Sequence, residues 1–433
     1  MKYIISHMSE TRSISFRLYP SKAQMRLLDA KHRMLKDLWN AALEERISAW
    51  RRGVRIGYND QAAHLKVVRT DLDGWQGLVH THEAQTVLKR LDLAFKAFFR
   101  RVREGQAPGF PRFRSSDSFR GWAYQEHGNG FRVEMRDGWR HGFVRLFGIG
   151  RMRIRGLGRT PGRILKADVT RGTFGWQLNV VVETDCALRA PAEGPDAGLD
   201  WGVADFATLA LSDGTFEAVP NPRHLQSETE ELRERQRGLS ALARARRISR
   251  RGLRLQRRSL ARRHAKVAAR RKDFLHKVTA RLAARHPVIA TEVLQIRNMT
   301  ATARGTIEAP GRNVAQKAGL NRSILDTAPA AFLNMLRYKA AEAGSEFLEA
   351  DTRRLKPSQR CPGCGAVRKK ALAVRRHDCD DCGCSHGRDE AAALTLLRWG
   401  LAEVAARDDA PDLSLPGNGH PAGTVGVSGA QAA

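Results

Sequence analysis

The order of polar and apolar residues changes along the first hundred positions. Residues 9–19 alternate and include β-branched and aromatic side chains, which predicts a strand. After Pro20 the apolar positions recur at intervals of three and four residues, from Leu27 through Leu35 to Ile47, which predicts a long helix. The same spacing returns over 58–72 and 82–104. This part of the chain is therefore expected to form one strand and a small helical unit.

Short alternating segments separated by glycine replace this pattern from Pro108 onward. Over residues 108–185 they predict an antiparallel barrel or sandwich. Residues 196–219 predict a strand followed by a hairpin with its turn at 212–214. The remaining segments indicate a buried strand at 286–294, a helix at 328–344, a strand at 345–351 and a helix from Asp389 to about residue 405. The chain is thus expected to be an α+β protein with several domains.

Residues 233–272 are the most basic part of the chain. They contain 17 Lys or Arg and one acid, Glu234. Apolar side chains recur there at every seventh position (Leu253, Leu260, Val267 and Phe274), which predicts a long helix with one apolar seam. We expect Gly252 to mark a bend between two such helices.

The composition favours a nucleic-acid partner. The 433 residues carry 75 Lys and Arg against 45 Asp and Glu, a formal net charge of +30. Such an imbalance destabilises the folded state by self-repulsion unless a polyanion neutralises it. An anionic membrane surface is the alternative partner, but no apolar run approaches the roughly 18 residues of a spanning helix. Five of the six cysteines are clustered, which is typical of metal binding in a reducing cytoplasm rather than of a disulfide framework.

Four of these cysteines have the spacing of a zinc ribbon. They form two pairs, Cys361 with Cys364 and Cys379 with Cys382. Four thiolates complete a tetrahedral Zn²⁺ site and leave no open position for water or substrate, so one structural Zn²⁺ is expected. Cys384 and His386 are possible substitute ligands but lie outside the paired spacing, and we interpret them as bystanders.

Three carboxylates are candidates for catalysis. Asp200 lies within the apolar strand AGLDWG, Glu292 at the end of the apolar run VIATEVL, and Asp389 at the start of an Ala/Leu helix. Taken singly, they could be a turn acid, a surface residue and a helix N-cap. Together they follow the order of acids in an RNase H-like fold, where two Mg²⁺ ions bind to carboxylate oxygens and promote phosphodiester hydrolysis. The cost of burying these charges also favours a bound cation.

Basic side chains at two places are candidate contacts for nucleic-acid phosphates. One place is the segment GFPRFR, and the other is the basic helix, whose nearly single-sign face is typical of phosphate binding. The candidates are Arg112, Arg114, Arg250, Arg251, Arg254, Arg257, Arg258, Arg262, Arg263, Lys266, Arg270 and Arg271.

Three ordered segments carry a resemblance to a known family. They are GLDWGVADFATLALSDG, RRKDFLHKVTARLAARHPVIATEVLQIRNM and LRYKAAEAGSEFLEADTRRLKPSQRCPGCG, the last continuing through CDDCGCSHGRDEAAALTLL. They resemble the transposon-encoded TnpB family, which is similar to compact type V CRISPR effectors. The likeness covers roughly residues 12–405, because YPSKAQ, LWNAAL and GFPRFR also look like TnpB.

The resemblance implies an RNA-guided DNA endonuclease in the cytoplasm or nucleoid of a prokaryote, with a guide RNA and double-stranded target DNA as partners. It implies that Asp200, Glu292 and Asp389 occupy the acid positions of a split RuvC nuclease domain. The expected organisation is a wedge-type β-barrel (1–20 and 105–190), a helical recognition lobe (21–104), the nuclease domain (191–358 and 385–405) with an arginine-rich hairpin at about 225–280, and a zinc ribbon (359–384). The composition of residues 406–433 predicts a disordered tail.

The third motif departs from the family pattern. The family usually has Asp-Arg-Asp-x-Asn-Ala-Ala, whereas this chain has Gly387 in place of the first Asp and Ala391 in place of the Asn. Pro357 also stands where the family favours Ser or Thr. The alternatives are a CRISPR effector, an RNA-guided DNA-binding regulator with a weakened nuclease site, and a DDE transposase, which the inserted ribbon and the arginine-rich hairpin fit less well.

Overall fold

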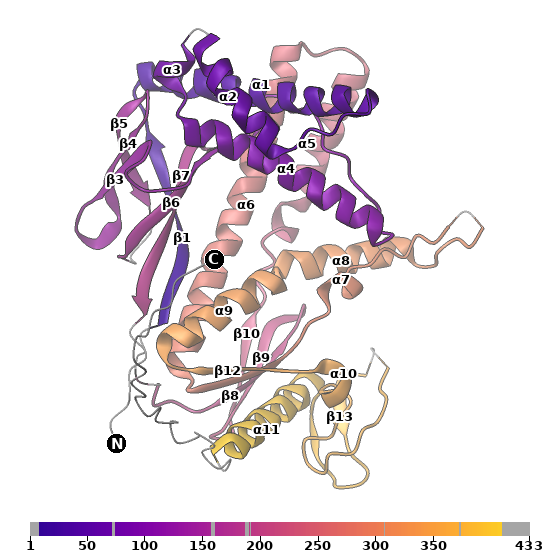
Figure 1. Cartoon of the computed structure of the whole chain (residues 1–433). Helices are drawn as coiled ribbons and strands as arrows, with labels where there is room; N and C mark the ends of the chain where they lie inside the picture. Colours follow the sequence, from indigo (N-terminus) through magenta and orange to yellow (C-terminus); the bar gives the residue numbers. More distant parts are fainter. Residues whose placement is uncertain are drawn as a thin grey trace, which may run out of the picture. The chain divides into compact units, whose positions relative to one another are not determined.

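The alternation of residues 9–19 corresponds to an observed strand. In the computed structural model this strand is β1 (Met8–Tyr19) (Figure 1). It buries Ile14, Phe16 and Leu18 and leaves the side chains between them exposed. The structure describes residues 8–71, 74–156, 161–186, 190, 192–306, 308–371 and 374–408. The chain divides into two units, of which the first comprises 1–189 with 224–274 and the second 190–223 with 275–433.

The first unit contains one seven-stranded antiparallel sheet. Its order is β2-β6-β7-β1-β5-β4-β3, and β1 pairs with β7 from Met8 opposite Cys186 to Arg17 opposite Gln177. The edge strands β2 and β3 are not paired with each other in the described part of the chain. The antiparallel β-character expected for 108–185 is confirmed. The other bounds are β2 (Gly121–Tyr124), β3 (Phe131–Met135), β4 (His141–Leu146), β5 (Gly150–Gly156), β6 (Arg163–Gly172) and β7 (Gly175–Cys186), with a 3₁₀ turn at Asp137–Trp139.

The three helices expected before residue 105 are confirmed as α1 (Lys22–Arg51), α2 (Tyr58–Asp71) and α4 (Thr81–Arg103). A short helix that was not predicted, α3 (Trp75–Leu78), lies between α2 and α4. Ser21 and Gln24 form a capping box at the start of α1, in which each side chain accepts a hydrogen bond from the other's backbone N–H at 3.2 and 3.0 Å. This reciprocal cap explains why the helix begins directly after Pro20.

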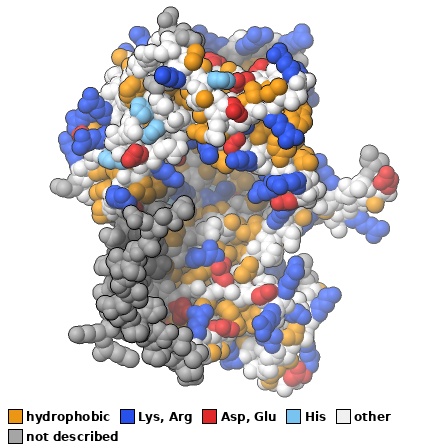
Figure 2. Space-filling view, viewed as in Figure 1, with side chains coloured by type: hydrophobic (Ala, Val, Ile, Leu, Met, Phe, Trp, Pro, Cys, Tyr) orange, Lys and Arg blue, Asp and Glu red, His pale blue; other side chains and the backbone are white. Residues whose placement is uncertain are grey.

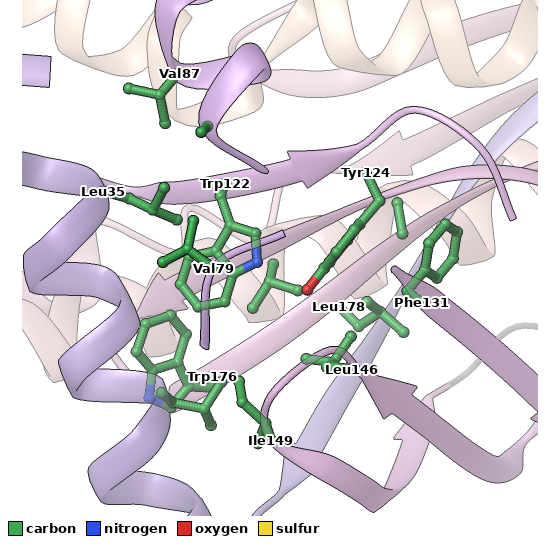
Figure 3. Packing of buried hydrophobic residues seen from close by; sticks show 14 of the residues in the cluster. Leu35, Val79, Val87, Trp122, Tyr124, Phe131, Leu146, Ile149, Trp176 and Leu178 are labelled. Atoms are coloured by element: carbon green, nitrogen blue, oxygen red, sulfur yellow. The ribbon is translucent and has the colours of Figure 1, made fainter. Parts of the chain in front are cut away.

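Aromatic side chains from the sheet form the centre of the first core. Trp122, Tyr124 and Trp176 are buried with Leu35 of α1 and Val87 of α4 (Figure 3). The helices therefore pack on the sheet through the apolar face that their spacing predicted.

A buried ion pair lies beside this core. Lys31 Nζ donates to Glu83 at 2.6 Å and to the carbonyl of Phe147 at 2.7 Å, and the Tyr124 hydroxyl also donates to Glu83. Burial lowers the pKa of Lys31 and raises that of Glu83, while the pairing opposes both shifts. Removing one partner would leave an uncompensated buried charge, so the pair holds α1 and α4 in a fixed relation.

The basic segment forms two helices, α5 (Gln226–Arg244) and α6 (Arg250–Arg285). The expectation that Gly252 marks their bend is wrong. The break lies at 245–249, where Arg246 has φ 54°, and Gly252 is already helical. Ser249 is the reason, because its hydroxyl accepts a hydrogen bond from the Gly252 N–H at 3.0 Å and caps α6. The seam is confirmed: Val267 is buried, and the other three seam residues are half-buried.

The second unit is built on a five-stranded sheet of order β10-β9-β8-β11-β12. Strands β8, β11 and β12 run parallel, while β9 and β10 form the predicted antiparallel hairpin. Figure 1 shows α9 and α11 on opposite faces of this sheet. The elements are β8 (Ala197–Trp201), β9 (Asp205–Leu211), β10 (Phe216–Pro220), β11 (Val288–Glu292), α7 (Ile296–Met299), α8 (Val314–Thr327), α9 (Pro329–Ala343), β12 (Glu346–Ala350), α10 (Thr352–Leu355), β13 (Arg376–Asp378), β14 (Ser385–Gly387) and α11 (Arg388–Asp408).

Helix α11 approaches the sheet through residues with little or no side chain. A methyl group at Gly198 of β8 would overlap the Ala393 carbonyl oxygen and the Leu397 nitrogen, and would lie 2.7 Å from Leu397 Cβ. A methyl group at Gly400 of α11 would overlap Cβ of Ala290 on β11. The two glycines therefore fix both the depth and the register of the helix on the sheet.

Most of the predicted tail, residues 409–433, lies outside the described residues. Within the described ranges, the chain has no helix that is both long and apolar enough to span a membrane.

We predict that Gly198→Ala lowers the free energy of unfolding of the second unit by about 1–3 kcal/mol, because backbone atoms of α11 would have to move. Thermal denaturation followed by circular dichroism measures this change. Gly319→Ala in α8 is the matched control, since a methyl group there meets only the end of the Arg322 side chain at 3.8 Å. Equal effects of the two substitutions would contradict this account of the packing.

Candidate active site and metal centre

Asp200 and Glu292 lie at the same edge of the second sheet. Strands β8 and β11 are parallel, and Gly198 pairs with Ala290. Two residues further along each strand, Asp200 and Glu292 lie at the same level on neighbouring strands, which are about 4.8 Å apart. Side chains two positions apart share a face, so both acids are on the face that α11 covers.

The register of α11 brings the third acid to this edge. Gly198 lies against Ala393 and Leu397. One helical turn before Ala393 is Asp389, and a turn advances about 5.4 Å, close to the 6.6 Å from Gly198 to Asp200 along the strand. Glu292 and Asp389 both act electrostatically on Asp200, which agrees with this convergence. The structure therefore brings the three sequence-predicted acids together.

Two of the acids, Asp200 and Glu292, are held where negative charge is unfavourable. Burial raises the pKa of Asp200 well above its ordinary value; Glu292 and then Asp389 add to the shift, and Arg388 opposes it. Burial also raises the pKa of Glu292, and a hydrogen bond from Thr352 opposes that shift. Sequence reasoning missed Thr352, although its position just after β12, the parallel neighbour of β11, places it at the same edge.

The three acids offer a less compact set of ligand atoms than the cysteine cluster described below. Each acid is half-buried, and only oxygen ligands are offered, which suits Mg²⁺. Among the described residues, the three carboxylates do not form a set whose ligand atoms all lie within 4.8 Å of one another. Two ions about 3.5–4 Å apart would not need such a compact set, because different carboxylates can bind different ions.

Glu390 caps the start of α11 from the third position of the helix. Its carboxylate accepts a hydrogen bond from the Gly387 N–H at 2.8 Å, which is the N3 half of a capping box at the start of α11. The Arg388 guanidinium donates to the carbonyls of Ala371 and Val374 at 2.9 and 3.3 Å. Both contacts hold the first turn of α11, which carries Asp389.

The four predicted zinc ligands form a compact cluster. Their sulfur atoms all lie within 4.8 Å of one another, and Cys361–Cys382 and Cys364–Cys379 are each 3.6 Å apart. A tetrahedral site with Zn–S bonds of about 2.3 Å has S···S edges of about 3.8 Å, so the set fits Zn²⁺. Burial raises the pKa of the Cys361 thiol, but hydrogen bonds from the backbone of Cys364 and Gly363 bring it down to about 6.

Two further side chains lie beside this cluster. Ligand atoms of His377 and Cys384 form a second set with Cys361, also within 4.8 Å. Cys384, which was interpreted as a bystander, lies beside the cluster because the β13–β14 hairpin returns it there, and its carbonyl accepts a hydrogen bond from the Cys379 N–H at 3.0 Å. His386 belongs to neither set, and its ring lies 5.5 Å from that of Phe216.

The basic residues of α6 differ in how far their charge is available to a partner. Arg263 pairs with Glu231, and Arg270 pairs with Glu228 at 2.7 Å, so acids of α5 neutralise both. Arg271 is half-buried. The remaining candidates on α6 are exposed: Arg250, Arg251, Arg254, Arg257, Arg258, Arg262 and Lys266.

The segment containing Arg112 and Arg114 is held against α1. Trp39 Nε1 donates to the Arg112 carbonyl at 3.1 Å, and the Arg114 guanidinium lies 5.2 Å from the centre of a Trp39 ring. Both arginine side chains are exposed. Figure 2 shows that Lys and Arg side chains are spread over the described surface on the visible face, with fewer acids among them.

Two family models match the chain. Residues 178–303 match OrfB_IS605, described as "Probable transposase", and residues 330–396 match "Cas12f1-like, TNB domain". Among curated proteins, "Putative RNA-guided DNA endonuclease InsQ" of Escherichia coli (strain K12) is 33% identical over 328 residues, which cover 74% of this chain and 75% of that protein. A "Putative RNA-guided DNA endonuclease" of Streptomyces pristinaespiralis is 30% identical over 404 residues, which cover 92% and 91%.

Two solved structures are also similar. A cryo-EM structure of a Cas12f1–sgRNA–target DNA complex aligns with a TM-score of 0.48 and 12% identity, covering 90% of this chain and 98% of that chain. The mini-RNA-guided endonuclease CRISPR-Cas_phi3 aligns with a TM-score of 0.46 and 10% identity, covering 91% and 92%.

We predict that Asp200→Asn raises the free energy of unfolding of the second unit near pH 7–8 in EDTA, by on the order of 1 kcal/mol. The amide removes a buried charge that Glu292 and Asp389 repel. A carboxyl with a raised folded-state pKa destabilises the fold at every pH above its unfolded-state pKa, because the unfolded chain then ionises more readily than the folded one. The increase in the free energy of unfolding caused by Asp200→Asn is therefore full above the folded-state pKa of Asp200 and vanishes as the pH falls toward about 4. Thermal denaturation across this pH range measures it.

Asp213→Asn is the matched control. Asp213 is exposed, and hydrogen bonds from the Thr215 hydroxyl and N–H, at 2.6 and 2.9 Å, lower its pKa. Its replacement should not raise stability at any pH. A gain at Asp213 as large as that at Asp200, or no gain at Asp200, would contradict the electrostatic account.

Proposed function

Since the chain belongs to the TnpB family of RNA-guided DNA endonucleases, we propose that it hydrolyses phosphodiester bonds of a target DNA that a bound RNA selects. The proposed site of hydrolysis is a two-metal centre formed by Asp200, Glu292 and Asp389. The observation that carries this proposal is the convergence of the three acids at one sheet edge, where burial raises the pKa of Asp200 and Glu292. Such a site is stabilised by divalent cations.

The chain's own residues hold and orient the reacting groups. Asp200, on which both other acids act electrostatically, would contribute to holding both ions, and Glu292 and Asp389 would each contribute to holding one. When bound, two Mg²⁺ ions lower the pKa of an attacking water and stabilise the leaving oxygen. The Thr352 hydroxyl donates to the carbonyl of Val293, the residue after Glu292, at 2.7 Å and so holds the end of β11, and Arg388 places positive charge beside Asp200.

The second unit has the features expected of an RNase H-like RuvC domain. A meander of β8, β9 and β10 is followed by parallel strands β11 and β12, with helices on both faces. We assign residues 191–358 and 385–405 to this domain and 359–384 to a zinc ribbon between them. The ribbon returns through β14 directly into α11, so a closed Zn²⁺ site there would brace the turn that carries Asp389.

The first unit is assigned to the nucleic-acid partners. We propose a wedge-type barrel from 1–20 and 105–190, a recognition lobe from 21–104 and an arginine-rich hairpin from about 225–280. Exposed arginines on α6 and the net charge of +30 support binding to RNA and DNA backbones. In RNA-guided systems base pairing reads the target sequence, and the protein holds the duplex largely by its backbone.

Asp200→Ala should reduce cleavage of a matched target by about 1,000-fold or more, equivalent to ~4 kcal/mol of transition-state stabilisation, while RNA-dependent target binding persists. Cleavage by the purified ribonucleoprotein in Mg²⁺ and an electrophoretic binding assay measure the two effects. Asp213→Ala is the control and should cut normally. Metal-dependent cutting by Asp200→Ala at the normal rate would refute the site.

The unsubstituted protein tests the rival function in the same assay. Ala391 is buried where the family usually has Asn, which favours a weakened site. Intact DNA with normal target binding would identify an RNA-guided regulator instead.

Cys379→Ser and Asp389→Ala should distinguish the structural role of the cysteine cluster from the catalytic role of Asp389. Cys379 is a buried member of the thiolate set, so its replacement should lower the affinity for Zn²⁺ and increase proteolysis of residues 359–388. Asp389→Ala should stop cleavage while Zn²⁺ affinity and RNA binding stay unchanged. Zinc titration against a chelator, limited proteolysis and cleavage assays on both variants measure the difference. An unchanged Zn²⁺ affinity in Cys379→Ser would contradict the metal assignment.

A further inference from the structure

The tetrathiolate set leaves two metal-binding side chains of the same region unused. Ligand atoms of His377 and Cys384 lie within 4.8 Å of each other and of Cys361. This second set therefore shares one sulfur with the first. Thiolate and imidazole are the ligands that Zn²⁺ and other thiophilic divalent ions prefer.

His377 has an unsatisfied polar atom in this position. The residue is 3% exposed, and its Nε2 makes no hydrogen bond within the described part of the chain. A buried polar group without a partner costs about 1–3 kcal/mol. The other ring nitrogen, Nδ1, contacts the ammonium group of Lys370, on which Cys361 and Cys379 also act electrostatically.

The local backbone brings Cys384 to the cluster. Strands β13 and β14 pair with His377 opposite His386, and the turn between them carries Cys379, Cys382 and Cys384. On the facing segment, a methyl group at Gly363 would lie only 3.2 Å from Cβ of Cys384. The absence of a side chain at Gly363 therefore leaves room for the fifth thiol.

The two sets differ in exposure and in charge. Cys364 and Cys382 are exposed, whereas Cys361 and His377 are buried and Cys384 is half-buried. Four thiolates around a divalent ion carry a net charge of −2, while two thiolates and a neutral imidazole carry none. The second set is thus better protected from solvent and carries less uncompensated charge, although it has one ligand fewer.

We propose that Cys361, His377 and Cys384 form a second ligand set for a thiophilic divalent ion. The ion shifts to this set, with Cys361 as the common ligand, when an exposed thiolate of the first set is lost. The ribbon therefore keeps its ion after Cys364 or Cys382 is blocked. This inference concerns metal retention only and does not depend on nuclease activity.

A double-substitution cycle in the full-length chain tests the proposal, with Co²⁺ as the probe. Chelator competition gives the affinity, and the sulfur-to-cobalt charge-transfer absorption reports bound thiolates. Cys384→Ser alone should change the affinity by less than about threefold. Cys364→Ser should still bind one Co²⁺ with charge-transfer absorption. In the Cys364→Ser background, Cys384→Ser or His377→Asn should lower the affinity for Co²⁺ by a further ~10–100-fold.

His386→Ala in the Cys364→Ser background is the matched control, because this histidine belongs to neither set; it should leave the affinity unchanged. Repeating the cycle with Cys382→Ser guards against one variant that fails to fold. Two results would overturn the proposal. One is loss of Co²⁺ binding in both the Cys364→Ser and Cys382→Ser backgrounds. The other is an equal change in Co²⁺ affinity when Cys384→Ser is made in the otherwise unsubstituted protein and in the Cys364→Ser variant.

Discussion

The close contact between α11 and strands β8 and β11 determines the candidate active site. Gly198 and Gly400 allow backbone atoms to approach where a methyl group would overlap them. This contact fixes how deep the helix lies and which turn faces which strand residue. Because Asp389 lies one turn before Ala393, the same contact places it beside Asp200. The position of a catalytic carboxylate thus depends on two residues that have no side chain and take no part in the chemistry.

The site that results is electrostatically unfavourable without a counter-charge. Burial and the neighbouring acids raise the pKa of Asp200, and Arg388 offsets only part of this effect. A divalent cation would relieve the repulsion, so the property that destabilises the isolated protein is the one that binds the ion. The surrounding contacts hold the acids in place against this repulsion. Glu390 caps the start of α11, Arg388 bonds to the preceding loop, and the cysteine cluster lies just before β14.

Local sequence patterns predicted most helices and strands, because alternation and three-to-four spacing report directly which face of an element is buried. They also predicted the three acids, since a charge within an apolar run needs a partner. The bend between α5 and α6 was predicted at Gly252 but lies at 245–249. The Ser249 hydroxyl caps α6 and so starts the helix before the glycine. The proximity of Cys384 to Cys361 was not predicted, because spacing along the chain does not show that a hairpin returns Cys384 to the cluster. Counting charge over 233–272 missed Glu228 and Glu231, which lie just outside that window and neutralise two arginines of α6.

The central claim is that α11, β8 and β11 together form one cation site. Anomalous diffraction from Mn²⁺-soaked crystals of the ribonucleoprotein tests it most directly. The account predicts strong manganese peaks between the carboxylates of Asp200, Glu292 and Asp389, about 3.5–4 Å apart where two ions are bound. Ordered carboxylates with no peak between them, or manganese bound only at other acids of the chain, would contradict it.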